Sequence, residues 1–320
     1  HSFPTRRSSD LGYRPFSDYG LAGFDGDGLE RTRQRLSYAG ELRSTFQGGL
    51  STTLGIRHDD NTSFKDFTTW RAALSWAVPG TGLRPHASVG TGVKLPGMLD
   101  QFGPSTAFFI PNPALRPETS FGWDAGLEWT TLGGRLLLDA TYFHSDLEDR
   151  IKGTPNFANF PITYTVENLP GRSVRQGVEL SARYQVMPSL LVGAAYTYLD
   201  ARDPDGLKEL RRPPHSGRVD VTAKSFDGRL TTSLAAIYNG TRPELVFTPT
   251  FSTLRSSLDA AWLLQAAASY KLTDAVEIFG RVENALDVRY QEAYGYQTGG
   301  VAAYAGVRIR FEDVAGTRQR

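Results

Sequence analysis

The sequence contains no cysteine, which excludes disulfide bonds, thiolate metal sites and cysteine nucleophiles. It also lacks any run of about 18 apolar residues, so no membrane-spanning helix is expected. The formal net charge is only +1, so a nucleic acid is not predicted as a partner. What remains is a 320-residue chain with 33 glycines and 12% aromatic residues, enough for one large domain or two ordinary ones.

Apolar and polar residues alternate with a period of two in many segments. Ser120–Thr130 is the clearest example, because its odd-numbered positions are apolar and its even-numbered positions are polar or glycine. Successive side chains of a strand point to opposite faces, so this period predicts β-structure. We predict about thirteen long strands, near 34–47, 49–59, 66–78, 82–93, 119–132, 135–147, 173–186, 189–200, 215–226, 228–240, 259–271, 274–286 and 301–311.

The connections between these segments alternate in length. Short turns rich in Gly, Pro and Asp are predicted at six places, which are 48–49, 79–80, 133–134, 187–188, 227–228 and 273–274. Longer segments, predicted to be irregular, separate them at 60–65, 94–118, 148–172, 201–214, 241–258 and 287–300. Short turns on one side and long loops on the other are typical of an outer-membrane barrel.

The contents of the two faces favour a membrane barrel over a soluble sandwich. One face carries charged residues such as Glu41, Arg71 and Glu128, while the other is apolar and has Trp76 and Trp129 near strand ends. A water-filled interior and an apolar band with aromatic girdles explain both faces. We therefore predict an all-β, antiparallel transmembrane β-barrel. Pro85 lacks a ladder donor, so its strand is expected to begin after it or to bulge there.

The ends of the chain are expected to lie outside the barrel. Residues His1–Leu11 resemble the in-frame translation of a sequencing adapter and are not expected to belong to the fold. Residues 12–33 are expected to be the remnant of an extracellular loop, 34–311 the barrel segment, and 312–320 a tail.

Four motifs occur in order along the chain. They are Asn112–Ser120 (NPALRPETS) followed by Trp123, Glu167–Arg172 (ENLPGR) followed by Gly177–Leu180 (GVEL), Arg211–His215 (RRPPH), and Val282–Tyr290 (VENALDVRY) followed by Gly295, Tyr296 and Gly300. Together they resemble the TonB-dependent outer-membrane receptors. His58–Phe64 and Gly295–Gly300 are most similar to the cobalamin (vitamin B12) receptor branch. Gly300-Val301 departs from the Gly-Arg of that family.

The resemblance implies a fragment of a receptor. The family has a barrel of about 22 strands, so this chain would hold the last thirteen or so, without the plug domain and the TonB box. It implies TonB-dependent import of cobalamin or a ferric siderophore across the outer membrane of a Gram-negative bacterium. The partners would be the TonB-ExbB-ExbD complex, reached through the missing plug, the cobalamin or metal-siderophore ligand, and outer-membrane lipid. Phe311 would be the aromatic membrane-insertion signal.

Seven loop residues are candidates for ligand binding, and each also has a structural interpretation. Phe102, Phe108 and Phe109 either contact ligand or pack the loop onto its neighbours. Arg211 and Arg212 either hold an anionic ligand or pair with Asp203 or Glu209. The remaining two, Tyr294 and Tyr296, have the same two interpretations as the phenylalanines.

No cofactor, metal site or catalytic group is expected, so the chain is not predicted to be an enzyme. His58-Asp59-Asp60 is interpreted as a solvated strand end, and Asp25–Gly28 lacks most of the spaced oxygens of a calcium loop. Two alternatives are a passive porin and a soluble β-rich binding module or glycosidase. The glycosidase would need a placed carboxylate pair such as Asp124 and Glu128.

Overall fold

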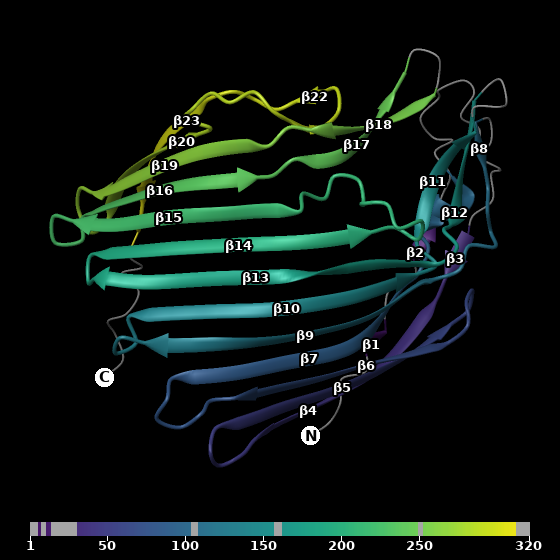
Figure 1. Ribbon diagram of the computed structural model, residues 1–320, viewed down its shortest axis with the longest axis horizontal. Helices are drawn as coiled ribbons and strands as arrows, with labels where there is room; N and C mark the ends of the chain where they lie inside the picture. Colours follow the sequence, from purple (N-terminus) through teal and green to yellow (C-terminus); the bar gives the residue numbers. More distant parts are fainter. Residues whose placement is uncertain are drawn as a thin grey trace, which may run out of the picture.

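The computed structural model describes residues 6–7, 11–13, 31–103, 108–156, 162–248 and 252–311, and its centre is one antiparallel sheet of 14 strands (Figure 1). In spatial order they are β1 (Arg6–Arg7), β4 (Arg35–Thr45), β5 (Leu50–Asn61), β6 (Phe67–Trp76), β7 (Leu83–Lys94), β9 (Glu118–Thr131), β10 (Leu136–Glu148), β13 (Arg172–Met187), β14 (Leu190–Arg202), β15 (His215–Ser225), β16 (Leu230–Asn239), β19 (Ala261–Lys271), β20 (Val276–Glu283) and β23 (Ala302–Ile309). All thirteen predicted strands are present.

The sheet is an open, curved wall in which the long strands follow one another in sequence order (Figure 1). Its order ends at β23 on one side and at β1 on the other, so the described strands do not close into a barrel. β1 pairs with β4 through two residue pairs only. Among the described residues, no helix has the length and apolarity needed to cross a membrane.

Four of the six long connections, 94–118, 148–172, 241–258 and 287–300, contain paired strands of their own, so the prediction that these four are irregular was wrong. Their described elements are α1 (Met98–Phe102), β8 (Phe109–Ile110) with β11 (Ile151–Asn156) and β12 (Thr163–Asn168), β17 (Arg242–Phe247) with β18 (Thr253–Leu258), and β21 (Gln291–Ala293) with β22 (Tyr296–Gln297). A further pair, β2 (Leu11–Tyr13) with β3 (Arg31–Arg33), precedes the first long strand. These strands are too short for a visible period. Figure 1 shows most of them beyond the right-hand strand ends, with the short turns at the left.

The outward face of the sheet is apolar and exposed. Leu42, Leu54, Ile56 and Val307 are each more than half exposed, and cross-strand pairing places Ile56 beside Trp70. Among the described residues, no second sheet or helical layer covers this face (Figure 1). Such a face needs another apolar partner, and hydrocarbon chains of a bilayer provide one.

The inward face is lined by paired polar side chains. Arg84 Nε donates to Glu128 Oε1 at 2.9 Å, and His86 Nε2 lies 2.9 Å from Asp139 Oδ2. The contact between His86 of β7 and Asp139 of β10 passes over Gly126 of the intervening strand β9. A Cβ added at Gly126 would overlap Thr141 Oγ1 and the His86 ring. The glycine therefore permits a polar link between β7 and β10 across the strand that separates them.

Pro85 lies inside β7, so the expectation of a later start or a bulge was wrong. The carbonyl of Gly82 points toward β9, where it accepts a hydrogen bond from the Thr130 N–H. The carbonyl of the next residue, Leu83, points the other way, toward β6, and accepts from the Val78 N–H. The backbone polar groups of successive strand residues point alternately to the two neighbouring strands, so the backbone nitrogen of Pro85, like the groups of Leu83, points toward β6. The β6–β7 ladder ends at Ser75↔His86, so the missing N–H of Pro85 interrupts no bond.

Candidate functional site at the bases of the long loops

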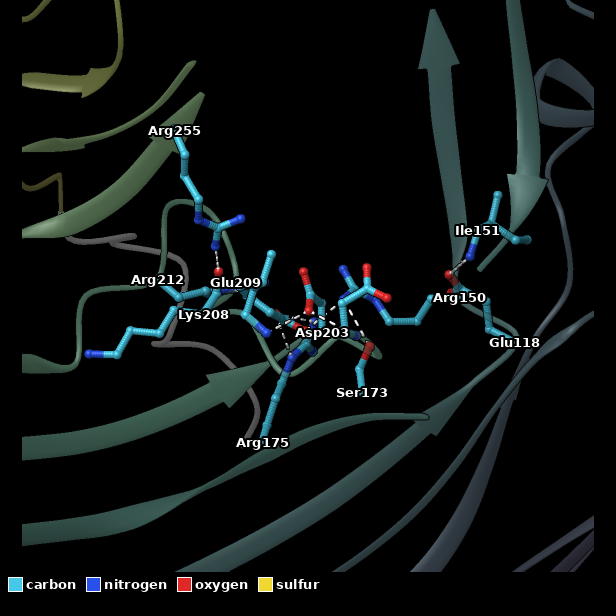
Figure 2. A network of polar contacts seen from close by, with 12 residues as sticks. Glu118, Arg150, Ile151, Ser173, Arg175, Asp203, Lys208, Glu209, Arg212 and Arg255 are labelled. Atoms are coloured by element: carbon cyan, nitrogen blue, oxygen red, sulfur yellow. Dashed lines mark hydrogen bonds and ion pairs between the residues drawn. The ribbon is translucent and has the colours of Figure 1, made fainter. Parts of the chain in front are cut away.

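A buried carboxylate gathers three guanidinium groups where the long loops leave the sheet (Figure 2). Glu209, between β14 and β15, is 5% exposed. It accepts hydrogen bonds from Arg150 at 2.7 Å and Arg175 at 3.0 Å, and Arg212 lies 3.9 Å away. Arg150 also donates to Ser173 Oγ at 3.1 Å. With three cations around one anion, this cluster retains positive charge that favours an anionic ligand.

A second buried carboxylate, Glu244 in β17, holds three segments together. Its side chain accepts from Arg211 Nε at 2.8 Å, from the Leu245 N–H at 2.9 Å and from the Tyr294 N–H at 3.2 Å. Burial by itself raises the pKa of Glu244, but these hydrogen bonds, led by that of Arg211, outweigh burial and hold the pKa below its usual range. The same contact raises the pKa of Arg211.

The structure brings four of the seven candidate ligand residues together. Arg211 and Arg212 are adjacent and point to different carboxylates, Glu244 and Glu209 respectively. Tyr294 is connected to Arg211 through Glu244, and the electrostatic influence of Tyr296 is the smallest of the causes that raise the pKa of Arg211. Both tyrosines are exposed, at 53% and 77%, so they can contact a ligand.

The three phenylalanines form a separate group. Phe109 is buried in a small apolar cluster with Leu115 and Val166, which favours packing as its role. Phe108 is 49% exposed, and its carbonyl accepts from the Tyr164 N–H at 2.8 Å. Phe102 is the last residue of α1 and is partly buried. Within this group Phe108 is the most accessible aromatic side chain.

Two motif asparagines fasten the 94–118 and 148–172 connections to each other. Asn112 Nδ2 donates to the Val166 carbonyl at 2.9 Å. Asn168 Oδ1 accepts from the Arg116 N–H at 2.8 Å, while its Nδ2 donates to the carbonyls of Arg116 at 2.9 Å and Asp149 at 2.7 Å. The asparagines of the NPALRPETS and ENLPGR motifs thus have a structural role at the loop bases.

We expect Asn168→Asp to loosen this junction. Aspartate keeps the acceptor but loses both donors and sets a negative charge against two carbonyls, at a cost of about 2 kcal/mol. Hydrogen exchange should then accelerate in 108–118 and 149–156, and only there. Asn239→Asp, at the end of β16, is the matched control, and equal protection in both variants would contradict this role.

The last motif works in the same way at the other end of the chain. Asn284 has a φ of 50°. Its Nδ2 donates to the Val288 carbonyl at 2.9 Å and its Oδ1 accepts from the Val288 N–H at 3.0 Å. Asp287 Oδ1 accepts from the Val301 N–H at 2.9 Å. These bonds fix the path of the loop that carries Tyr294 and Tyr296.

The remaining candidates stay outside this site. His58 contacts Thr68 at 2.8 Å and Asp60 at 3.0 Å, and the ligand atoms of His58, Asp60 and Asp66 lie within 4.8 Å of one another. Asp66 also accepts from the Asn61 N–H, so local hydrogen bonds already use this strand end. Asp25–Gly28 lies outside the described residues. Phe311, just beyond β23, is 89% exposed.

Residue patterns did not reveal the two anchoring carboxylates as a pair. Glu209 was considered as a partner of the adjacent arginines, and the 3.9 Å contact with Arg212 agrees with that interpretation. Glu244, Arg150 and Arg175 were missed, because their partners are 33, 59 and 34 positions away in the chain. The carboxylate pair that the glycosidase alternative would need is engaged in other contacts, since Ser88 donates to Asp124 and Arg84 donates to Glu128.

Comparison with known proteins identifies a family for this chain. The family model described as "TonB dependent receptor-like, beta-barrel" matches residues 2–285. The vitamin B12 transporter BtuB of Photobacterium profundum is 30% identical over 259 residues, which cover 80% of this chain and 40% of that protein. BtuB of Vibrio cholerae is 30% identical over 263 residues, covering 80% and 39%.

Solved structures of low sequence identity share the fold. The ferric enterobactin receptor PfeA of Pseudomonas aeruginosa superposes with a TM-score of 0.75 at 18% identity, covering 93% of this chain and 48% of that one. The siderophore receptor PirA of Acinetobacter baumannii gives a TM-score of 0.74 at 17% identity, covering 93% and 49%.

Proposed function

Because this chain belongs to the TonB-dependent receptor family, we propose that it forms the C-terminal part of the barrel of a receptor that imports cobalamin or a ferric siderophore. The chain spans about 40% of the curated relatives it matches. A plug domain and a TonB box would lie in the remainder. Residues 34–311 would be the barrel segment, 12–33 a loop remnant, 312–320 a tail, and 1–11 foreign sequence.

The observation that carries the proposal is the cationic and aromatic cluster at the loop bases. Glu209 neutralises only one of the three guanidiniums around it, and Tyr294 and Tyr296 are exposed beside Arg211. Guanidinium groups suit phosphate and carboxylate groups, and tyrosine rings suit flat conjugated ligands. A cobalamin or a metal-siderophore combines such groups, and the similarity to BtuB supports the choice of cobalamin.

In this proposal, the ligand binds the loops from outside the cell, in the outer membrane of a Gram-negative bacterium. The TonB-ExbB-ExbD complex then pulls on the plug, and the ligand passes along the charged inner face. The barrel segment performs no bond chemistry. Its ion pairs, such as Arg84–Glu128, would contact the plug across a hydrated interface. Phe311 would act in membrane insertion.

The test requires the full-length receptor in a host that lacks its own cobalamin and siderophore receptors. We expect uptake of labelled cobalamin or ferric siderophore that is abolished by deletion of TonB. Uptake that persists without TonB would indicate a passive porin instead.

The site itself is tested by the double variant Arg211→Gln/Arg212→Gln. Loss of two charge-assisted contacts at about 1.5 kcal/mol each should lower ligand affinity roughly a hundredfold. Arg218→Gln/Arg183→Gln, on the sheet away from the loops, removes the same charge and should change affinity less than threefold. Equal ligand affinity in the two double variants would show that the ligand does not bind at the loop bases.

A further inference from the structure

The outward face of the sheet contains an apolar groove with a volume of about 640 Å³. Small residues from five neighbouring strands, β10, β13, β14, β15 and β16, form its floor. They are Ala140, Ala182, Ala194, Gly217 and Ala236. Larger side chains form its walls, among them Leu127, Leu138, Leu180, Tyr196, Tyr238 and Trp262. Volumes of this size accommodate single small molecules or acyl chains.

A cationic pocket of about 490 Å³ adjoins the loop end of this groove. Tyr238 lines both cavities. Tyr196, from the groove, shares a hydrogen bond of 2.7 Å with Nδ1 of His215, from the pocket. The pairs Tyr198↔His215 and Tyr238↔Trp262 show that these side chains belong to the outward face of the sheet. The two cavities are therefore neighbours on one face, the first apolar along the strands and the second polar at the loops.

The pocket has more positive than negative charge. Arg202, Lys208, Arg212 and Arg242 line it, whereas Asp200 is the one acid among the described lining residues. Asp200 pairs with Arg202 at 3.0 Å. The remaining cations leave a positive field at this end of the groove.

Arg242 provides an independent indication of an anion. Its side chain is 5% exposed, and its Nη2 donates to the Gln291 carbonyl. Its Nη1 is buried and has no hydrogen-bond partner among the described residues. A buried guanidinium is costly unless a nearby anion compensates its charge. A negative group in the pocket would supply that compensation.

We propose that the groove and the pocket together bind one phosphate-bearing acyl lipid of the outer leaflet. This inference rests on the proposed location of the chain in the outer membrane. An acyl chain lies over the small residues of the groove, and the phosphate lies among Arg202, Lys208 and Arg242. Tyr196, Tyr198 and Tyr238 stand at the boundary, where aromatic rings with a polar tip are favoured.

A lipid fits this feature better than a soluble ligand does. The groove opens on the face that carries the exposed apolar residues, and it shares Tyr238 with the charged pocket. A soluble anion would bind in the charged pocket alone and would bury no apolar surface of the groove. A neutral lipid would cover the apolar groove but would provide no negative charge for the cations of the pocket. Only an anionic lipid satisfies both parts.

The test uses the full-length receptor purified in mild detergent, with native mass spectrometry and diphosphoryl lipid A as the probe. Each cation near a lipid phosphate contributes about 1 kcal/mol, so Arg202→Gln/Lys208→Gln should weaken lipid A binding roughly 25-fold. The matched control Arg229→Gln/Lys224→Gln removes two charges at the opposite strand ends and should change binding less than twofold. Ala194→Phe, which fills the groove, should weaken binding at least tenfold.

Two further probes separate the lipid from its headgroup. Inorganic phosphate and phosphatidylcholine should each fail to displace lipid A. Displacement by inorganic phosphate would overturn the inference, as would equal lipid A binding by all variants. Folding of each variant is checked by heat-dependent mobility in gel electrophoresis. TonB-dependent uptake is measured in parallel, so a receptor that binds lipid A but imports nothing would contradict the proposed function alone.

Discussion

Replacing Glu244 by leucine is expected to release both the β17–β18 hairpin and the last long loop. The substitution removes the acceptor of Arg211 and of two backbone N–H groups while keeping side-chain volume. Breaking a buried charge pair costs about 3 kcal/mol, so local opening should increase more than a hundredfold. Hydrogen exchange in 242–248, 252–258 and 291–297 measures this change, and ligand affinity should fall with it.

Glu41→Leu is the matched control for this carboxylate. Glu41 bonds Arg43 and Arg71 on the open inner face, where its side chain is 32% exposed. Such exposed pairs contribute between zero and about 1 kcal/mol. Exchange that is equally fast in the two variants would show that Glu244 does not anchor the loops.

The same anchor predicts a pH dependence. The folded pKa of Glu244 lies below its usual value, so its carboxylate stabilises the loop junction at pH values above the unfolded pKa. That contribution is lost as the pH falls from the unfolded pKa through the folded one. Protection of the Leu245 and Tyr294 N–H groups should therefore decline under acidic conditions in the wild type. The Glu244→Leu variant should lack this dependence.

The second large effect is expected from Gly177→Ala, in the GVEL motif of β13. A Cβ at this position would overlap the carbonyl oxygen of Tyr198 in β14, and the ring of Phe143 would lie 2.9 Å from it. A backbone atom in a paired strand has little freedom to move, so we expect a loss of about 3 kcal/mol. The folded fraction, measured by heat-dependent gel mobility, and the urea midpoint should both fall.

Gly280→Ala is the control for this prediction. Gly280 also lies inside a strand, but its Cβ would meet the nearest atom, the Tyr304 carbonyl oxygen, at an ordinary 3.5 Å. It should cost well under about 1 kcal/mol, since strand propensities span only that range. A Gly177→Ala variant as stable as Gly280→Ala would refute the steric argument.

The alternation of residues determined the strands of this protein and the identity of their two faces. That pattern is local: each strand has its own period of two, so all thirteen long strands were predictable without knowledge of their neighbours. Proline was harder to interpret, because the missing donor of Pro85 matters only if a ladder runs beside it. The β6–β7 ladder stops at His86, the residue that follows Pro85, and only the fold shows that.

The tertiary structure alone decided how the loops join and which residues share a site. Arg211 and Arg212 were visible as a pair of charges, but their separation onto Glu244 and Glu209 depends on loops that meet in space. The same holds for Tyr294, which is 50 positions from Glu244. Alternation arises from the backbone of a single strand, whereas a buried ion pair requires two distant segments to dock. The strands could therefore be predicted from the sequence, whereas the buried ion pairs form only when distant segments come together in the folded chain.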